Sequence, residues 1–227
     1  MSEVSLAPPE RRDPYLRAYQ SLRRDLVSGA RQPGDQIIVT EAARHLAISP
    51  TPVREALARL VGERLVDDRR HHGYFVPLPS WFDLLELYEL CEMCLVSALR
   101  SVERRRQSAG RARADAEGPA NRAVLSTSPD DPFARLHYAI LSRAPNAKLT
   151  ATGCLVVDAL AAARRMEAEI YPGPDFEVAR LDLLADADAK PLLSAVRLEF
   201  RLRRHRAEPV AYALAARHRA KNRLDMV

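Results

Sequence analysis

The chain has 227 residues, of which 47% are hydrophobic and 29% are charged, a balance that can bury a core and that excludes wholesale disorder. From this length we expect two domains. The formal net charge is +5 and the pI is about 9.4, which permits a polyanionic partner without demanding one.

No apolar run approaches the ~18–20 residues that a membrane-spanning helix needs. The N-terminal sequence also lacks the apolar core of a signal peptide. The cysteines, Cys91, Cys94 and Cys154, form neither a disulfide framework nor the paired CxxC spacing of a zinc site. We therefore expect a cytoplasmic protein with reduced thiols and no membrane contact.

The N-terminal part of the chain alternates between helical and strand-like patterns. Residues 1–13 are polar and aperiodic, so we expect a flexible arm there. Over residues 14–77 we first expect a helix from Tyr15 to a turn at Gly29, followed by a strand-like run at 36–39. A helix capped by Thr40 comes next, and a break at 47–50 separates it from a helix over Thr51–Leu60. The last element is a hairpin with strands at 64–66 and 74–77 around a basic tip at 67–73. This order of elements predicts a winged helix-turn-helix.

One stretch of this domain carries a specific motif, Ser49-Pro50-Thr51-Pro52-Val53-Arg54-Glu55-Ala56-Leu57. It resembles the signature Ser-Arg-Thr-Pro-Val-Arg-Glu-Ala-Leu of GntR-type transcriptional regulators. The two differ only at Pro50, where relatives usually carry an arginine that touches DNA. Pro33-Gly34 and the run 73–76 also fall where the family has them. The resemblance covers residues 15–77 and implies a DNA-binding domain that lacks one usual contact.

The predicted recognition helix carries donors that suit bases and phosphates. Ser49, Thr51 and Arg54 lie at its N-terminal end, and Arg54 is the best candidate for bidentate recognition of guanine. Arg59 lies over a turn later, and we expect it to pair with a phosphate or with Glu63. Further candidates for DNA contacts, on the preceding helix and on the basic wing, are Thr40, Arg44, Arg70, His72 and Gly73, of which the resemblance implies the last two.

After a stiff linker at 78–80, residues 81–227 have mainly helical periodicity. We expect a helix over Trp81–Val102 capped by Ser80, followed by a loop or frayed helix over 103–131. A helix then begins near Phe133 and ends at a break at 144–146. Helical structure follows from Leu149 to about Ile170, and after a turn at 171–174 there is a further helix. The predicted fold class is mainly α, with an all-α helical bundle after the winged domain.

This second half resembles FCD, the all-helical effector domain of the GntR subfamily named for the fatty-acid regulator. The runs 83–90, 137–140 with Asn146, and 183–188 have the order of that domain. A rival interpretation concerns residues 194–214, whose alternation of apolar and charged side chains is typical of a β-hairpin. That segment resembles the closing strands of UTRA, the α/β effector domain of another GntR subfamily. The helical pattern from Trp81 to Ile170 favours the all-helical domain.

Many FCD domains hold a divalent metal through one aspartate and three histidines, and the resemblance maps these positions onto Phe133, His137, Glu177 and Glu199. With the aspartate and two imidazoles replaced, no metal is expected, and His137, Glu177 and Glu199 are only weak candidates for ligands. The alternative role for His137 is a hydrogen-bonded histidine inside the bundle. Cys91 stands where relatives usually direct an arginine at the effector, so a carboxylate effector would lose that contact. The candidates for an effector pocket are Tyr88, Cys91, His137, Glu177 and Glu199.

A basic cluster occupies the C-terminal part of the chain. A charge run is usually a solvated face, and we expect this one to lie far from the winged domains of a dimer. Its members are Arg201, Arg203, Arg204, Arg206, Arg217, Arg219, Lys221 and Arg223.

No catalytic triad, paired carboxylates or glycine-rich phosphate loop appears with supporting context, so no enzyme is predicted. The combined interpretation is a ligand-responsive dimeric repressor, with a double-stranded DNA operator and an unidentified small-molecule effector as partners. The alternative is a ligand or redox sensor with weakened DNA binding, for which Pro50 is the only hint. Cys91 and Cys94 share a helix face and could respond to oxidation, although packing of small residues explains them better.

Overall fold

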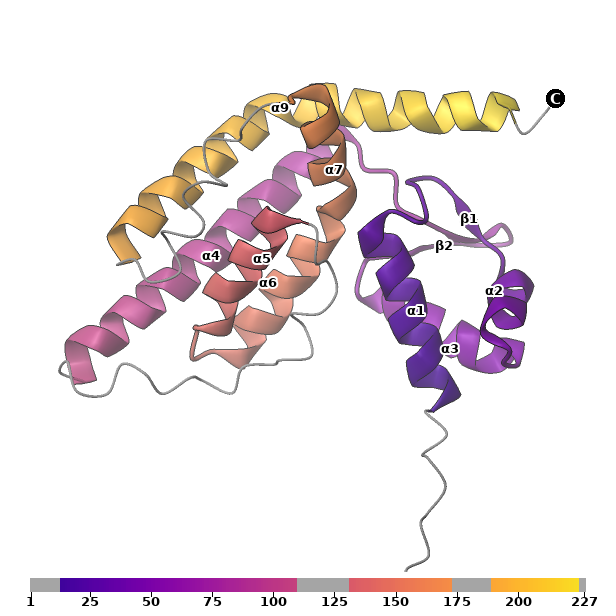
Figure 1. The fold of residues 1–227 in the computed structure, drawn as a ribbon, viewed down its shortest axis with the longest axis horizontal. Coiled ribbons are helices and arrows are strands. Elements are labelled where there is room, and N and C mark those ends of the chain that lie inside the picture. Colours follow the sequence, from indigo (N-terminus) through magenta and orange to yellow (C-terminus); the bar gives the residue numbers. More distant parts are fainter. Residues whose placement is uncertain (1–12, 110–130, 173–188, 225–227) are drawn as a thin grey trace, which may run out of the picture.

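The fold consists of two units joined by a short extended segment (Figure 1). A computed structural model describes residues 13–109, 131–172 and 189–224. The first unit contains α1 (Pro14–Ser28), β1 (Gln36–Ile37), α2 (Val39–Leu46), α3 (Pro50–Gly62), β2 (Asp67–Arg69) and β3 (Gly73–Phe75). The second contains α4 (Trp81–Ala109), α5 (Pro132–Ser142), α6 (Ala147–Ala159), α7 (Ala161–Ile170) and α9 (Ala189–Leu224). The predicted fold class is confirmed. The arm predicted at 1–13 lies, apart from Asp13, outside the described residues.

The ends of α1 follow from the local sequence. The Asp13 carboxylate accepts a hydrogen bond from the Tyr15 N–H at 2.9 Å, and Pro14 fits the first turn, where its missing N–H costs nothing. Gly29 ends the helix with φ 84°, a left-handed conformation that glycine adopts without strain. These two ends fix the helix against which α3 packs.

The prediction that Thr40 caps the second helix is wrong. α2 begins two residues earlier than that cap implies, at Val39, because Ile38 already has the extended backbone of a capping position, and no side chain caps this end. The helix ends at Leu46, and the left-handed φ of 50° at the following Ala47 lets its N–H bond back to the last turn. This sharp break orients α3, which begins at Pro50, across α2.

The wing is a three-stranded antiparallel sheet in the order β1-β3-β2, and its hairpin is shifted from the prediction. The strands were expected at 64–66 and 74–77, whereas the pairing leaves a tip of only 70–72. Leu65 and Val66 precede the strand because both are buried, 5% and 2% exposed. Neighbouring residues of a strand point to opposite faces, so this pair belongs to the domain core and not to a half-solvated hairpin.

The core of the first unit is formed by one face of each helix together with residues of the sheet. Burial of this apolar surface supplies the main stabilisation of the unit. Its members are Ala18, Leu22, Leu26, Ile37, Ala42, Ala43, Val53, Ala56, Leu57, Leu60, Leu65, Val66 and Val76.

The helix α4 is longer than predicted, because it continues past Val102 to Ala109. Of the two alternatives expected at 103–131, a loop or a frayed helix, the described residues 103–109 are helical. Apolar residues are scarce there, but Gln107 donates a hydrogen bond to Glu103 one turn earlier at 3.0 Å, a spacing that stabilises a solvated helix. Periodicity alone underestimated this helix because its last turns have no apolar face.

Side-chain caps define where the bundle helices begin. The predicted cap at Ser80 is confirmed, since its hydroxyl accepts a hydrogen bond from the Asp83 N–H at 3.2 Å. Asp131 caps α5 by accepting from the Ala134 N–H at 3.0 Å. Asn146 likewise caps α6, which follows the predicted break at 144–146.

The helix α9 settles the rival interpretation of residues 194–214, which are helical and form no β-hairpin. Val196, Phe200, Ala207, Val210 and Leu214 recur at helical spacing and are all buried. Figure 1 shows that the first part of α9 runs along α4, and that the helix then changes direction and extends over the winged unit. Pro209 lies inside the helix, where a missing N–H favours such a bend. None of the described helices is long and apolar enough to cross a membrane.

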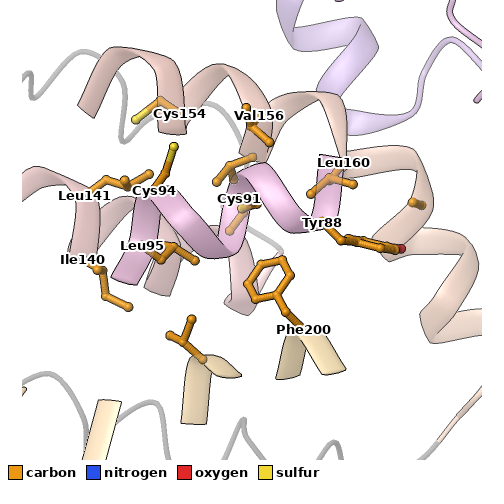
Figure 2. Close-up of a cluster of buried hydrophobic side chains, with 14 of the residues drawn as sticks. Tyr88, Cys91, Cys94, Leu95, Ile140, Leu141, Cys154, Val156, Leu160 and Phe200 are labelled. Atoms are coloured by element: carbon orange, nitrogen blue, oxygen red, sulfur yellow. The ribbon is translucent and has the colours of Figure 1, made fainter. Parts of the chain in front are cut away.

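The bundle core is built around α4. Figure 2 shows Tyr88, Cys91 and Leu95 directed at side chains from α6 and α9, including Phe200. The edge of the Tyr88 ring faces Phe200 with 6.3 Å between centroids, an arrangement that aromatic pairs favour. This core is separate from that of the winged unit.

A buried ion pair joins the two units. Arg23 of α1 donates to the Asp158 carboxylate of α6, and their side chains are 10% and 0% exposed. The hydroxyl of Tyr138 donates to the other oxygen of the same carboxylate. Arg165 adds a hydrogen bond to the Val27 carbonyl oxygen at the end of α1.

The end of α9 makes a second connection between the units. The prediction that the basic cluster lies far from the winged unit is therefore wrong for the end of this cluster within one chain. The Lys221 ammonium contacts the Asp35 carboxylate at 2.7 Å. The imidazole of His218 packs so closely against Gly34 that a Cβ at this glycine would overlap the ring. The bend of α9 brings these residues over the turn before β1.

Candidate functional site

The residues predicted to contact DNA all belong to the winged unit. Each of them except Gly73 is exposed, and Gly73 is half-buried. They are Thr40, Arg44, Ser49, Thr51, Arg54, Arg59, Arg70, His72 and Gly73.

The start of α3 presents unused donors. Ser49 precedes the helix, and its side chain makes no capping hydrogen bond. Arg54, in the second turn, forms no hydrogen bond or ion pair with another residue of the described ranges. Pro50 and Pro52 in the first turn have no N–H, so the free backbone donor that this end offers to an anion is that of Thr51. This end of α3 can therefore bind both phosphate and base edges.

Arg59 has partners within the protein. Its Nε donates to Glu63 at 2.9 Å, and a terminal nitrogen donates to the Tyr15 hydroxyl at 3.2 Å. The guanidinium carbon also lies 4.1 Å from the centroid of the Tyr19 ring. The predicted pairing with Glu63 is confirmed, and the arginine fastens α3 to α1.

The wing tip is shaped by its own backbone contacts. His71 and Gly73 have φ of 64° and 93°, and only the glycine adopts this conformation without steric cost. The Nδ1–H of His72 donates to the Arg70 carbonyl oxygen at 2.9 Å, and Gln36 of β1 donates to the His72 carbonyl oxygen at 2.8 Å. These bonds leave the Arg70 side chain exposed at the tip.

The structure brings together four of the five residues predicted for an effector pocket. Tyr88 and Cys91 from α4, His137 from α5 and Glu199 from α9 are all buried. The His137 ring stacks on Phe200, with 5.6 Å between centroids, and its Nε2–H donates to Glu199 at 3.1 Å. His137 is thus the hydrogen-bonded bundle histidine that was the alternative to a metal ligand. Glu177 lies outside the described residues.

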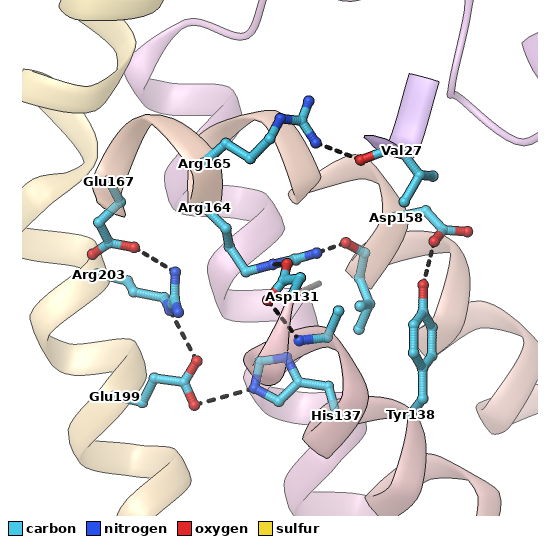
Figure 3. Close-up of polar contacts among 12 residues, drawn as sticks. Val27, Asp131, His137, Tyr138, Asp158, Arg164, Arg165, Glu167, Glu199 and Arg203 are labelled. Atoms are coloured by element: carbon cyan, nitrogen blue, oxygen red, sulfur yellow. Dashed lines mark hydrogen bonds and ion pairs between the residues drawn. The ribbon is translucent and has the colours of Figure 1, made fainter. Parts of the chain in front are cut away.

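The centre of this site is Arg203, which was predicted to belong to a solvated run of charged residues. Arg203 is only 5% exposed and donates through Nε to Glu199 at 2.9 Å and through a terminal nitrogen to Glu167 (Figure 3). Burial would raise the pKa of Glu199, but His137 and Arg203 lower it to about 2. The carboxylate is therefore ionised and paired on both oxygens.

A signal for Arg203 existed in the sequence. Once residues 189–224 are taken as one helix, Arg203 falls on the stripe that carries Phe200, Ala207 and Val210. A charge on an apolar stripe is a buried charge, and a buried charge needs a partner. The competing strand interpretation of 194–214 hid this stripe.

The residues present do not fit the metal site that the FCD resemblance implies. Phe133 offers no ligand atom, and its ring instead faces the Arg203 guanidinium at 4.8 Å. The Nε2 of His137 is committed to Glu199, which in turn is held by Arg203. Asp131, the nearest aspartate in sequence, caps α5 and binds Arg164 at 2.6 Å. Within the described ranges no group of three metal-ligating side chains converges.

Three buried polar atoms around this site have no hydrogen-bond partner within the described part of the chain. They are the Tyr88 hydroxyl, His137 Nδ1 and one terminal nitrogen of Arg164. Burial raises the pKa of Tyr88 to about 12, so its hydroxyl remains a donor. Buried donors and acceptors are rarely left unpaired, and such atoms mark places where a small polar molecule or water binds.

The cysteines are poorly suited to sensing oxidants. Cys91, Cys94 and Cys154 are all free and buried, and burial raises the pKa of each thiol, that of Cys154 to about 12. The thiolate is the form that reacts, so a raised pKa makes a thiol inert.

Comparisons with known proteins support the assignment of the winged unit. Residues 14–76 match the family described as bacterial regulatory proteins, gntR family. The HTH-type transcriptional repressor GlaR of Escherichia coli is 34% identical over 74 residues, which are 33% of this chain and 34% of that protein. The Nta operon transcriptional regulator of Aminobacter aminovorans is 38% identical over 69 residues, 30% of this chain and 33% of that protein. The matches span about a third of the length of these relatives.

The fold of the whole chain is similar to a solved GntR regulator. The crystal structure from Rhodococcus sp. RHA1 aligns with a TM-score of 0.57 and 19% identity, and the alignment covers 89% of this chain and 97% of that one. The likeness extends to the helical domain at the level of the fold. Residues 14–76 therefore form a winged helix-turn-helix unit that matches the gntR family, and a helical bundle follows it.

Proposed function

We propose that this protein is a dimeric DNA-binding transcription regulator, acting as a repressor, whose affinity for its operator is changed by a small molecule bound in an FCD-like helical domain. Two winged domains bind the half-sites of an imperfect palindrome, as is usual for dimeric helix-turn-helix proteins. The effector favours one arrangement of these domains and so shifts the population that binds DNA.

The proposal depends above all on the N-terminal end of α3. In this gntR-family domain the exposed guanidinium of Arg54 has no partner within the described ranges, and the first turn of the same helix offers the free backbone N–H of Thr51. A guanidinium can bond two acceptors of guanine, whereas a free backbone N–H suits phosphate. Pro50 removes one family contact but leaves the Arg54 side chain and the Thr51 N–H in place.

The effector part of the proposal is supported by the unpaired buried atoms and by their connection to the winged unit. His137 and Tyr138 are adjacent on α5, one facing the Glu199 and Arg203 cluster and the other bound to Asp158. Asp158 holds Arg23 of α1. A molecule that shifts α5 therefore acts on the ion pair between the units.

The test is binding of the purified protein to DNA from upstream of its own gene, against scrambled competitor, over a series of salt concentrations. We expect selective binding that persists near physiological salt. Arg54→Ala should weaken it by about 1–3 kcal/mol, roughly 5- to 150-fold, while association with scrambled DNA changes little. Arg201→Ala is the matched control, because it removes an equally exposed arginine from the bundle.

Binding that vanishes with salt and ignores sequence would contradict the proposal, since only phosphate contacts would then remain. That result would favour the alternative of a ligand sensor with weakened DNA binding. Equal losses in Arg54→Ala and Arg201→Ala would remove Arg54 from base recognition and indicate an effect of net charge.

A further inference from the structure

The cluster around Arg203 has the arrangement of ligands around a cation. Glu199 and Glu167 each place one carboxylate oxygen on the guanidinium, from α9 and α7. The second oxygen of Glu199 is held by His137, and the second oxygen of Glu167 by Arg206 at 3.2 Å. All of these side chains except that of Arg206 are almost fully buried.

Buried carboxylates need a positive partner, because removal from water without one is costly. A divalent ion or a guanidinium can supply that charge. The guanidinium differs in that it is covalently attached, is ionised at every accessible pH and presents its donors in a fixed planar geometry. Here it also packs on the face of Phe133, which suits an arginine and offers nothing to a metal ion.

We propose that Arg203 is the built-in cation of the helical domain, and that it holds Glu167, Glu199 and His137 together without a metal ion. The proposal concerns the centre of the bundle and holds whether or not the chain binds DNA. An effector entering this site meets a guanidinium already paired with two carboxylates, in place of the open coordination positions of a metal.

The first experiment compares the wild-type protein before and after dialysis against a chelator. We expect the tag-free protein to contain no stoichiometric metal by mass spectrometry and to keep its melting temperature after dialysis. Added Zn²⁺ or Mn²⁺ should leave that temperature unchanged. One tightly held metal per chain, lost to the chelator together with a fall in melting temperature, would overturn the proposal.

The second experiment removes the cation. Arg203→Ala leaves Glu167 and Glu199 buried without their shared partner and opens a space beside them and His137. We expect this variant to melt well below the wild type and to gain a site for Zn²⁺ or Mn²⁺, with a rise in melting temperature of more than about 5 °C at saturation. The matched control is Arg204→Ala, which removes the neighbouring, more exposed arginine that pairs with Glu92.

A second control separates this gain from binding at surface histidines. Arg203→Ala combined with Glu199→Gln keeps the space but removes one of the two carboxylate ligands, so the metal should stabilise it much less than it stabilises Arg203→Ala. If Arg203→Ala folds and responds to metal no more than the wild type does, the position is not a cation site and the proposal fails.

The design also covers a variant that does not fold. If Arg203→Ala is unfolded, the expected result is that Zn²⁺ or Mn²⁺ restores its helical circular dichroism. Arg203→Met combined with Glu199→Met replaces the guanidinium and one carboxylate at similar volume, leaves Glu167 paired with Arg206, and should fold without metal. Failure of that double variant to fold, together with failure of metal to rescue the single one, would show that the arginine acts by packing and would overturn the proposal.

Discussion

At the scale of single residues, the bundle depends on charges that are buried with assigned partners. Glu199 is 4% exposed, yet it is ionised because Arg203 and His137 each hold one of its oxygens. A pair of this kind is costly to break from one side, since the remaining charge stays buried. Such a residue makes stability depend on pH.

The pH dependence follows from the direction of the Glu199 shift. Its pKa is about 2 in the folded protein and near 4.5 when unfolded, so its contribution is present above the unfolded value and is lost as pH falls from about 4.5 towards 2. At neutral pH we expect Glu199→Gln to lower the free energy of unfolding by roughly 3 kcal/mol. The gap to the wild type should narrow as pH falls below about 4.5, because protonation of Glu199 then removes the same charge in the wild type.

Urea unfolding at a series of pH values measures this gap directly. A difference that stays constant from neutral to acid pH would mean that Glu199 titrates normally. A variant at His137 serves as the comparison. It removes a donor to Glu199 but keeps the carboxylate and Arg203, so its free energy of unfolding should still fall as pH is lowered below about 4.5.

Exposed candidate residues could be predicted better than buried ones. Arg54 lies in a local motif and is exposed, whereas its contact with DNA stays a prediction. Arg203 could not, because its burial depends on which face of α9 meets α4 and α7. Asp158 was not selected at all, since its partner Arg23 lies in the other unit.

At the scale of elements, local pattern predicted the helices and missed their limits. The alternation over 194–214 satisfied a strand template, yet the same apolar residues also satisfy a helical one, and packing against α4 decides between them. The predicted hairpin is shifted from the observed one because the apolar pattern assigns Leu65 and Val66 to a strand. Their burial comes instead from the core beneath the sheet.

The contact between α9 and the turn before β1 can be tested at Gly34. Its φ of 89° disfavours any side chain, by about 1–2 kcal/mol, and a methyl group would also overlap the His218 ring. We expect Gly34→Ala to lower stability and to speed hydrogen exchange at the end of α9. Gly34→Ala combined with His218→Ala should recover the steric part and keep the backbone cost.

Unfolding free energies of both variants and of His218→Ala complete the cycle. Strict additivity of the two substitutions would mean that the imidazole and the turn do not meet in solution.

At the scale of the whole molecule, the two units are held in one arrangement by a buried and an exposed ion pair. Asp158→Asn leaves Arg23 with no counter-charge at a site that is only 8% exposed, and we expect a cost of about 3–5 kcal/mol. Arg23→Met combined with Asp158→Asn removes the stranded charge and keeps an acceptor for Tyr138, so it should recover most of that loss. Chemical unfolding measures all three variants.

The exposed pair supplies the control. Lys221→Met removes the partner of Asp35 where the lysine side chain is 46% exposed, and we expect a change below about 1 kcal/mol. A double variant at Arg23 and Asp158 that costs the sum of its singles would show that the pair contributes no coupling between the units.

The contact of Lys221 with Asp35 joins residues that are 186 positions apart in the chain. During synthesis at ~5–20 residues per second, the turn before β1 waits roughly 10–40 s before the end of α9 exists. The winged domain has its own apolar core and can fold in that interval, but it does so without its neighbour. A nascent or truncated chain would therefore carry a folded winged unit, with Asp35 still unpaired by Lys221, before the helical domain has formed.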